Sequence, residues 1–469
     1  MKIIVIGAGL AGAATAHALA VRGCDVTVLE ASGLCSQLSC APTSAPTSAP
    51  TSAPTSALTS ALTSALAPSL PSAALSSASS TLFSATAALS TAPSAGLPVA
   101  LLARHYTQYQ KQHQSQHAAN GEAAWPTSPV SSLTQLSHLG VAATLQAARS
   151  LLVQGQDWQP CGALQRAGKL GLQAHWLGDA AWVKPAALVA AWLAHPRITL
   201  RLDTPVHSVR YTPENSTASA YAEQQIINKD DPSNLKNIHW QALAADGSLA
   251  GQAHAVVLAN AYQAKALLAR LELTPRLGAA LHEVAGQVIY GPWTEDWQTL
   301  WPSLLPELAQ HSQAHTGAAN PCAINGNGHF IPAVPWGGSD NTGQHIWLSG
   351  STYEHDAPHN PQVTALGIAA NLQRLQQLIS GAATLLAAQH SAGLLRGWAG
   401  TRCTTRDRLP VAGAVSAAIA PGLYMCSAMG SRGLSFAALC GQEVAARITA
   451  TRSALPDHLR RAVDPARFF

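Results

Sequence analysis

The sequence predicts an α/β fold, α+β overall, in which a parallel βαβ domain is interleaved with a mainly antiparallel-sheet domain. Three observations lead to this prediction. The first thirty residues follow the order strand, glycine turn, helix and strand. Residues 422–449 repeat the order strand, glycine turn and helix. Between these ends, residues 284–353 contain strand patterns without long helices, which is typical of an antiparallel sheet.

The N-terminal residues predict a complete βαβ unit. The apolar run from Lys2 to Ile6 predicts a buried strand, and an apolar helical pattern follows from Leu10 to Val21. Gly23 marks the end of that helix, and Asp25 to Leu29 predict the second strand.

Three glycines and one acidic residue indicate what this unit binds. Gly7, Gly9 and Gly12 stand in G-x-G-x-x-G order directly after the first strand. We expect Gly7 to allow the tight turn, Gly9 to let the backbone approach a pyrophosphate, and Gly12 to permit close helix–strand packing. The helix N-terminus would face the phosphates. Glu30, eighteen residues beyond Gly12, would accept a hydrogen bond from a ribose hydroxyl. The unit therefore predicts a Rossmann-like dinucleotide site.

A secretory signal peptide is the alternative interpretation of these residues, with Lys2, an apolar run and Ala16-His17-Ala18 as a cleavage-like site. Three glycines interrupt that run, and cleavage would remove half of the βαβ unit, so we expect a cytoplasmic protein. No stretch supplies about eighteen uninterrupted apolar residues, which predicts that no segment crosses a membrane.

Charge and residue spacing exclude further classes. Lys and Arg number 27 against 23 Asp and Glu, and the resulting net charge of +4 is too small for bulk coating of nucleic acid. The eight cysteines show no C-x-x-C spacing, so reduced thiols are expected. Two histidine pairs have no third ligand nearby, so we expect no metal site; the pairs are His113 with His117 and His355 with His359.

Residues 36–94 are predicted to be a disordered low-complexity insertion. Four APTS copies begin at Ala41, and Ala, Pro, Thr and Ser dominate the whole segment. Such a composition has too few large apolar groups to offset the entropy of ordering. A weak helix near residues 58–75 is the alternative, against which Pro68 and Pro71 argue.

The rest of the chain alternates between helix and strand patterns. Helices are predicted over residues 133–153, 181–193, 261–271 and 361–388. A strand pair is predicted over residues 198–211, and single strands over 255–260, 284–290, 328–334, 346–353 and 422–427. A polar loop or hairpin tip is expected over residues 214–238, and a glycine-opened helix over residues 430–449.

Because nucleotide-binding elements stand at both ends of the chain, we expect an interleaved domain organisation. The nucleotide-binding domain comprises residues 1–35, most of 95–275 and residues 395–469, and the substrate domain comprises part of 95–275 and residues 276–394. A second glycine-opened helix suits FAD, because the first unit would hold its adenosine end. The positive end of the second helix would then point at the isoalloxazine ring.

Two sets of motifs resemble known families. The opening unit, GTRCTTRDRLPVAG at residues 400–413, GLY at 422–424 and GSRGL at 430–434 resemble the glycine/D-amino-acid oxidase family of FAD-dependent oxidoreductases. Further stretches are VVLANAYQ at 256–263, VAGQV at 284–288, SAMGSRGL at 427–434 and VDPARF at 463–468. More narrowly, these resemble the oxidoreductase domain of the bacterial enzymes that make 5-methylaminomethyl-2-thiouridine at the tRNA wobble position.

This resemblance implies non-covalent FAD and oxidation of a C–N bond in an N-substituted glycine. In the narrower family, the substrate is the carboxymethylaminomethyl group on the wobble uridine of tRNA. Hydride transfer from its glycine methylene and hydrolysis would give the 5-aminomethyl form and glyoxylate. A methyltransferase domain commonly precedes the oxidoreductase in that family, whereas this chain begins at the flavin motif. The resemblance therefore implies a separate methyltransferase as a partner.

The resemblance also implies the role of Arg402, at the position of the family's carboxylate-binding arginine. A guanidinium fork matches the two oxygens of a carboxylate. The alternative is an arginine that pairs with Asp407 or caps a loop. Asp407 itself is expected to be structural, as an orienting partner or a turn former. Arg406 and Arg408 are expected either to face tRNA phosphates or to be solvated surface arginines.

Further residues are assigned by the same resemblance. Val206 is expected to pair its backbone with the adenine, with a strand-core valine as the alternative. Tyr353 and Tyr262 would line the pocket or simply pack, and Cys403 is expected to form no covalent flavin link. Flavin contacts are expected from Gly430, Ser431, Arg432 and Gly433, with a plain helix-start turn as the alternative. A tRNA-contacting tail or a solvated basic tail is expected from Arg447, Arg452, Arg460, Arg461 and Arg467.

Two other functions remain open at this point. An oxidase or dehydrogenase of free glycine, sarcosine or D-amino acids would keep the flavin and Arg402 but need no tRNA surface. A flavin-binding protein without turnover would result if the insertion disturbed the site.

Overall fold

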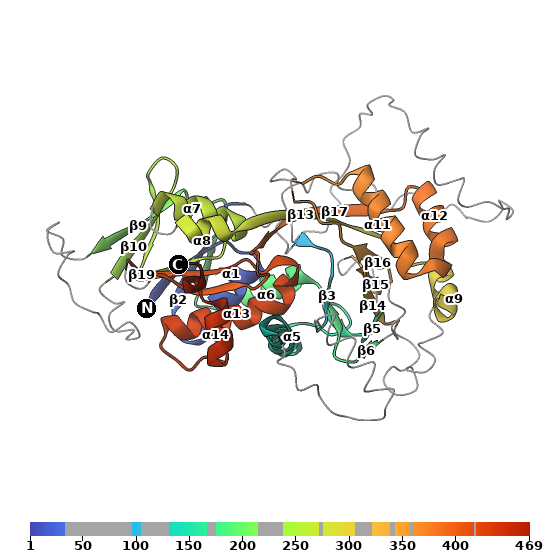
Figure 1. The fold of residues 1–469 in the computed structure, drawn as a ribbon, viewed down its shortest axis with the longest axis horizontal. Helices are drawn as coiled ribbons and strands as arrows, with labels where there is room; N and C mark the ends of the chain where they lie inside the picture. Colours follow the sequence, from blue (N-terminus) through green and yellow to red (C-terminus); the bar gives the residue numbers. More distant parts are fainter. Residues whose placement is uncertain are drawn as a thin grey trace.

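The computed structural model describes ten stretches of the chain and shows an elongated arrangement of two groups of elements (Figure 1). Both chain termini lie in one group, and the strands β13 and β17 run from it toward the other group (Figure 1). The predicted low-complexity insertion and most of residues 214–238 lie outside the described residues. The ten described stretches are residues 1–32, 96–104, 131–166, 175–213, 238–271, 275–304, 321–337, 343–355, 361–416 and 419–469.

A six-stranded sheet forms the centre of the first group, in the order β18-β19-β12-β1-β2-β8. All neighbours pair in parallel except β18 and β19, which form an antiparallel hairpin. The strand β1 is nearly fully buried, because neighbouring strands and packed helices cover both of its faces. The bounds are Lys2–Ile6 (β1), Asp25–Leu29 (β2), Ile198–Arg201 (β8), Ala255–Leu258 (β12), Val411–Ser416 (β18) and Ala420–Ser427 (β19).

Two helices cross closely on this sheet, α1 (Leu10–Val21) and α13 (Gly433–Ile448). Gly441 makes the crossing possible: a Cβ atom at this position would lie 2.8 Å from the backbone of Ala14 and Thr15. The helix α5 (Ser132–Leu151) packs against the start of α13. A Cβ atom at its Gly140 would lie 2.0 Å from the carbonyl oxygen of Ser435. The earliest and latest segments of the chain are therefore joined by glycine contacts.

A three-stranded sheet, β11-β10-β9, packs against the strands β1, β12 and β19 of the first group, and the short helix α7 packs against β9. Trp240 of β10 is fully buried, and its indole N–H donates to the carbonyl oxygen of Pro421 at 2.9 Å. The predicted strand pair over residues 198–211 is wrong, because β8 pairs with β2 and β9 pairs with β10. The bounds are Ser208–Pro213 (β9), Ile238–Leu243 (β10), Leu249–Ala253 (β11), Ala264–Leu271 (α7) and Pro275–Ala280 (α8).

The second group is built on a seven-stranded sheet, β17-β13-β16-β15-β14-β5-β6, which is antiparallel except between β14 and β5. Aromatic rings of α9, β15 and β16 fill the space between the sheet and its helices. The strand bounds are Ala163–Gln165 (β5), His175–Leu177 (β6), His282–Pro292 (β13), Ala323–Gly326 (β14), Gly328–Pro335 (β15), His345–Gly350 (β16) and Arg396–Thr404 (β17). The helix bounds are Glu295–Leu304 (α9), Ala365–Leu378 (α11) and Ala383–Ser391 (α12).

Two predicted helices differ from the structure. Residues 361–388 form α11 and α12, separated by a short 3-10 turn at Ser380–Ala382. Residues 181–193 form the strand β7 (Ala181–Val183) and then α6 (Pro185–Leu193), because proline suits the first helical turn and the residues before it are extended. The strand β7 lies between β3 (Ala100–Leu102) and β4 (Trp158–Pro160) in a small sheet.

The chain ends in α14 (Asp457–Val463) and a 3-10 turn at Pro465–Phe468. Arg447 fixes this tail, since it forms ion pairs with Glu443, at 2.6 Å, and with Asp464. No helix among the described residues is long and apolar enough to span a membrane. The α/β fold class that the sequence predicts is confirmed.

The close crossing of α1 and α13 can be tested with Gly441→Ala. Alanine raises helix propensity by up to about 1 kcal/mol, but its methyl group would meet the backbone of Ala14, which cannot move aside. We expect the free energy of unfolding, measured with urea, to fall by about 1–3 kcal/mol. Gly278→Ala in α8 is the matched control, because a Cβ atom there would meet only Lys265 at 3.9 Å. If the free energy of unfolding of Gly441→Ala equals or exceeds that of the native protein, the two helix backbones are not in the close contact described here.

Candidate active site

In the glycine turn between β1 and α1, the neighbouring backbone leaves no room for side chains at the first and third glycines. Gly7 has a φ of +101°, and a Cβ atom on it would lie 2.9 Å from the carbonyl oxygen of Ala259. A Cβ atom on Gly12 would lie 1.8 Å from the carbonyl oxygen of Gly7. At Gly9, the residue that caps α1, a Cβ atom would meet nothing within 4 Å. The backbone of Gly9 therefore faces open space.

The N-terminus of α1 provides donors to that space. No side chain caps the helix, so its first backbone N–H groups are available to an anion. Asn260 lies beside Gly7, and its buried side-chain oxygen has no hydrogen-bond partner among the described residues. Open space, free donors and an unpaired acceptor are what a bound dinucleotide would require here.

Glu30 is held at the edge of this turn by three hydrogen bonds. The N–H of Ala8 donates to one carboxylate oxygen at 2.7 Å. The N–H and hydroxyl of Ser32 donate to the other at 3.2 and 3.0 Å. The carbonyl oxygen of Glu30 accepts from the N–H of Thr204 at 2.8 Å. This contact brings the segment between β8 and β9, which contains the half-buried Val206, next to Glu30.

The second glycine turn lies close to the first. Gly430 has a φ of +57°, and the 3-10 turn Gly430–Arg432 leads directly into α13. A Cβ atom on Gly433 would lie 3.5 Å from the side chain of Leu10, so the N-termini of α13 and α1 are neighbours. A Cβ atom on Gly430 would lie 3.8 Å from Thr404, at the end of β17. The second turn thus lies between the six-stranded sheet and the long strand that carries Arg402.

Arg402 lies on β17 against the neighbouring strand β13, where Gly286 leaves space for it. A Cβ atom on Gly286 would lie 2.0 Å from a guanidinium nitrogen of Arg402. The guanidinium donates to the hydroxyl of Ser351 at 2.7 Å and to the carbonyl oxygens of Ala285 and Thr352 at 3.3 and 3.4 Å. Burial lowers the pKa of Arg402. Its hydrogen bonds go to neutral oxygens, so its positive charge can bind a carboxylate from outside.

Asp407 is held elsewhere. It accepts from Thr405 and Leu409 within its own turn and forms an ion pair with Arg467 at 2.9 Å. Burial raises the pKa of Asp407, but these hydrogen bonds and the charge of Arg467 outweigh it and lower the pKa. The alternative pairing of Arg402 with Asp407 is therefore not the arrangement in the structure.

Tyr353 lies over Arg402, whose guanidinium carbon is 4.8 Å from the ring centroid. Ser431 of the second glycine turn donates to the Tyr353 hydroxyl at 3.4 Å. Burial raises the pKa of Tyr353, but the hydrogen bond from Ser431 and the charge of Arg402 together bring it below its usual value. Tyr353 thus connects the expected flavin turn to the expected carboxylate site, whereas Tyr262 packs against the core of the nucleotide-binding sheet.

His329 is a residue of this site that the sequence does not single out. It lies on β15 opposite Gly350, and its buried Nε2 atom has no hydrogen-bond partner among the described residues. Burial, and after it the charge of Arg402, lowers the pKa of His329 to about 4. A neutral imidazole with an unpaired nitrogen therefore lies near Arg402.

Cys403 follows Arg402 on β17 and points to the opposite side of the strand, into the core. Burial raises the pKa of the Cys403 thiol to about 11, so it is a thiol at neutral pH. Within the described stretches, no group of three or more His, Cys, Asp or Glu residues could hold a metal ion. Of the histidine pairs considered above, three members (residues 113, 117 and 359) lie outside those stretches.

The basic tail is largely engaged in internal contacts. Arg447 and Arg467 form the ion pairs given above, and Arg460 pairs with Asp457 at 3.0 Å. Arg452 and Arg461 are exposed. The tail arginines therefore stabilise the fold more than they form one continuous basic surface.

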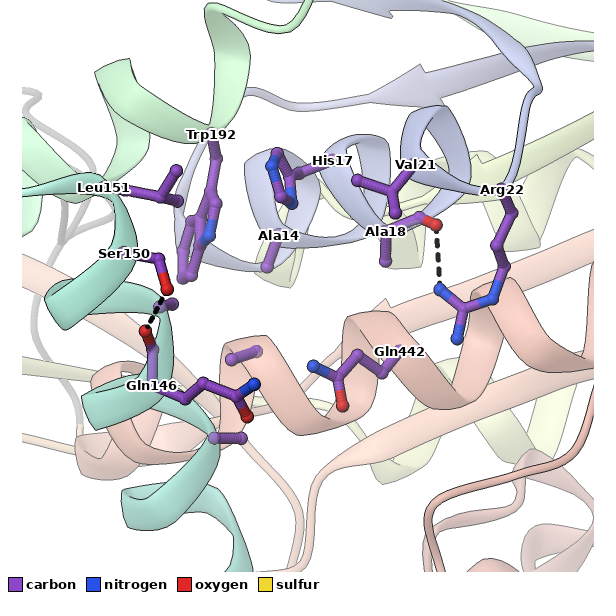
Figure 2. A pocket seen from close by; sticks show the side chains of 13 residues that line it. Ala14, His17, Ala18, Val21, Arg22, Gln146, Ser150, Leu151, Trp192 and Gln442 are labelled. Atoms are coloured by element: carbon purple, nitrogen blue, oxygen red, sulfur yellow. Dashed lines mark hydrogen bonds between the residues drawn. The ribbon is translucent and has the colours of Figure 1, made fainter.

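A groove between α1, α5 and α13 lies away from the two glycine turns (Figure 2). Most of its α1 residues, such as His17 and Val21, come from the C-terminal half of that helix, and Gln146 and Gln442 face each other across it (Figure 2). Neither Glu30 nor Arg402 contributes to its lining. The candidate active site is therefore at the other end of α1.

The neutral state of His329 predicts a pH dependence of stability. A histidine in the unfolded chain titrates near pH 6.5, roughly the model-peptide value. Between that pH and about 4, the unfolded state binds one proton more than the folded state, so the free energy of unfolding falls as pH falls. We expect urea unfolding of His329→Gln to lose less stability than the native protein between about pH 7 and 5. The exposed His390→Gln is the control, and equal pH slopes for all three proteins would refute the prediction.

The comparison with known proteins agrees with this geometry. A family model described as FAD dependent oxidoreductase matches residues 2–447. The tRNA 5-methylaminomethyl-2-thiouridine biosynthesis bifunctional protein MnmC of Albidiferax ferrireducens is 36% identical over 320 residues, which cover 67% of this chain and 46% of that protein. The protein of the same name from Polaromonas sp. is 33% identical over 370 residues, which cover 71% of this chain and 50% of that protein. The chain thus spans about half the length of these curated relatives.

Solved structures share the fold. L-Proline dehydrogenase from P. horikoshii has a TM-score of 0.56 at 14% identity, with 100% of this chain and 97% of that chain covered. Iminodiacetate oxidase from Chelativorans sp. BNC1 has a TM-score of 0.55 at 14% identity, with 99% of both chains covered. Glycine oxidase from Geobacillus kaustophilus has a TM-score of 0.54 at 15% identity, with 97% and 96% covered. Because the family model matches nearly the whole chain, the protein belongs to the family of FAD-dependent oxidoreductases.

Proposed function

We propose that this enzyme oxidatively removes the carboxymethyl group from 5-carboxymethylaminomethyl-(2-thio)uridine at the tRNA wobble position. The products are the 5-aminomethyl form and glyoxylate. The observation that carries the proposal is the Arg402 guanidinium, which is partly buried, hydrogen-bonded only to neutral oxygens and placed beside the second glycine turn. The similarity to tRNA 5-methylaminomethyl-2-thiouridine biosynthesis proteins supports a tRNA-linked N-substituted glycine as the substrate.

The cofactor is held by the two glycine turns in this proposal. Gly7, Gly9 and Gly12 form the cradle for the pyrophosphate at the N-terminus of α1, and Glu30 accepts from the adenosine ribose. The backbone of Val206 pairs with the adenine. The flavin end is contacted by Gly430, Ser431, Arg432 and Gly433.

The chain's own residues position the substrate. FAD supplies the hydride acceptor for oxidation of a CH–NH group. Arg402 binds the substrate carboxylate, and Ser351 with the carbonyl oxygens of Ala285 and Thr352 fixes the guanidinium plane. Tyr353 covers this plane from the side of Ser431. Cofactor binding is non-covalent in this proposal, because the neighbouring Cys403 is a buried thiol.

The proposed setting is the cytoplasm, where tRNA is the substrate. The relatives are named as bifunctional biosynthesis proteins of a methylaminomethyl nucleoside. We therefore propose that a methyltransferase acts on the aminomethyl product.

A second candidate function is the oxidation of free glycine, sarcosine or D-amino acids. The fold shared with glycine oxidase and iminodiacetate oxidase makes this the main alternative. One arginine for the carboxylate and one flavin would suffice for such substrates. A flavin-binding protein without turnover is the third candidate.

Anaerobic mixing of the holoenzyme with undermodified tRNA and, separately, with sarcosine distinguishes these functions. We expect tRNA alone to bleach the flavin absorbance. Bleaching by sarcosine would instead support the oxidase of free amino acids. Bleaching by neither substrate would favour a protein without turnover.

The role of Glu30 predicts a selective loss of cofactor in Glu30→Gln. The amide of glutamine keeps one acceptor oxygen. Its NH₂ group, however, would face either Ala8 or Ser32, which donate to the carboxylate of Glu30 in the native protein. Loss of a hydrogen bond to a charged group costs about 1.5–3 kcal/mol, so we expect FAD affinity to fall at least about tenfold in titrations of the apoprotein. Asp25→Asn at the other end of β2, where Asp25 pairs with Arg197 at the surface, should bind FAD normally. Equal affinities of both variants would count against the assignment.

The role of Arg402 predicts a selective loss of substrate reduction in Arg402→Lys. An ammonium keeps the charge but cannot form the bidentate contact or keep all the contacts with Ser351, Ala285 and Thr352. We expect the second-order rate of flavin reduction in anaerobic stopped flow to fall at least about tenfold. A tenfold decrease corresponds to a loss of roughly 1.4 kcal/mol of transition-state stabilisation. FAD content should not change. Arg396→Lys on the same strand is the control, and unchanged reduction by Arg402→Lys would show that another group binds the carboxylate.

A further inference from the structure

The turn between β17 and β18 is rigidly braced. The hydroxyl of Thr405 donates to Asp407 at 2.6 Å and to the carbonyl oxygen of Leu409 at 2.8 Å. The N–H of Leu409 donates to the same Asp407 oxygen at 3.0 Å. Arg467 from the C-terminal tail then pairs with the second oxygen of Asp407 and donates to Leu409. These contacts hold the turn in one shape. Arg467 of the C-terminal tail neutralises Asp407, the only carboxylate of the turn.

Two exposed arginines, Arg406 and Arg408, flank Asp407 on this turn. Neither forms an ion pair with a described residue. Arg408 has a φ of +60°, a conformation that L-residues rarely adopt. The turn thus presents to solvent two positive charges that no acidic residue in the described stretches pairs with.

These charges lie beside the candidate active site. The turn directly follows β17, and Thr404 at the end of that strand would lie 3.8 Å from a Cβ atom on Gly430 of the second glycine turn. Burial, and to a smaller extent the charge of Arg408, lowers the pKa of the half-buried Arg432 in that turn. Ser431, the neighbour of Arg432, donates to the hydroxyl of Tyr353, which exposes 54% of its surface although its ring lies over Arg402. Exposed cations beside an exposed aromatic ring are the features that bind single-stranded nucleic acid. A free amino acid would not need these exposed arginines, because Arg402 alone would bind its carboxylate.

We propose that the turn with Arg406 and Arg408 contacts tRNA phosphates and positions the anticodon strand while Arg402 binds the carboxylate of the wobble nucleoside. This inference rests on the proposed function. Phosphate contacts fix position and orientation rather than sequence, so the turn would serve any tRNA that carries the modified wobble uridine. Its bracing by Asp407 and Arg467 keeps the two arginines in register with the site.

The test is the double variant Arg406→Gln with Arg408→Gln, prepared as the FAD holoenzyme. A matched double variant, Arg149→Gln with Arg210→Gln, removes the same charge from exposed positions on α5 and β9. Arg149 adjoins the groove at the far end of α1, since Ser150 and Leu151 line it (Figure 2). The affinity for undermodified tRNA is measured by fluorescence anisotropy at several salt concentrations, and flavin reduction by the isolated 5-carboxymethylaminomethyl nucleoside is measured anaerobically.

We expect the turn variant to lose on the order of tenfold in tRNA affinity and to show a shallower salt dependence. The slope of log affinity against log salt should decrease by roughly 0.7 for each lost phosphate contact on single-stranded RNA. The nucleoside should reduce both double variants at the native rate, and the matched variant should keep the native tRNA affinity and slope. A turn variant with native affinity and slope, or equal losses in both variants, would overturn the inference alone. Failure of tRNA to reduce the flavin of the native enzyme would instead overturn the proposed function.

Discussion

The contact between the N-termini of α1 and α13 is the constraint on which the rest of the structure depends. Gly433 lies against Leu10, and Gly441 lets the two helix backbones meet at Ala14. Because each helix follows a glycine turn at the end of a parallel strand, this contact places both turns at the same edge of the sheet. Two sets of backbone N–H donors thereby face one extended region. That arrangement is what distinguishes a site for a long dinucleotide from one for a mononucleotide.

The antiparallel sheet supplies the complementary part of the site. The strands β13 and β17 are the longest in the described chain and extend from the nucleotide-binding group to the second group (Figure 1). Gly286 on one strand leaves the space that Arg402 on the other occupies. The residues after β16 then provide Ser351 as a hydrogen-bond partner and Tyr353 as an aromatic cover. In the proposed function, the cofactor and the substrate carboxylate would be bound by different sheets, and the hydrogen bond from Ser431 to Tyr353 is one of the contacts between these two parts of the chain.

Much of this could be predicted from the sequence, because the glycine turns have strict local requirements. The opening βαβ unit, the late strand and the glycine-opened helix are confirmed, and so is the family. The helix over residues 181–193 was wrong at its start, since three strand residues before Pro185 are too short for a periodic pattern. The domain boundaries and the roles of the individual site residues stay predictions.

His329 shows what local patterns cannot reveal. On a strand, neighbouring side chains point to opposite faces, so either His329 or Phe330 had to face the core. Phe330 packs among the tryptophans of the second group, and His329 therefore faces the side of Arg402. Only the order of the seven strands determines which face is the core, and that order joins segments far apart in the sequence. The same holds for the Asp407–Arg467 pair, whose partners are separated in the sequence by β18, β19, α13 and α14.

The strand order also determines when the site can form during synthesis. The strand β1 emerges first, but its neighbour β12 follows only after residue 254, and β19 and α13 follow near the end of the chain. The N-terminal glycine turn and α1 are therefore synthesised well before α13, the helix that packs against α1. Until β12 is made, β1 can pair only with β2 among its two neighbours in the sheet. The packing of α13 against α1 therefore joins segments that are far apart in the order of synthesis.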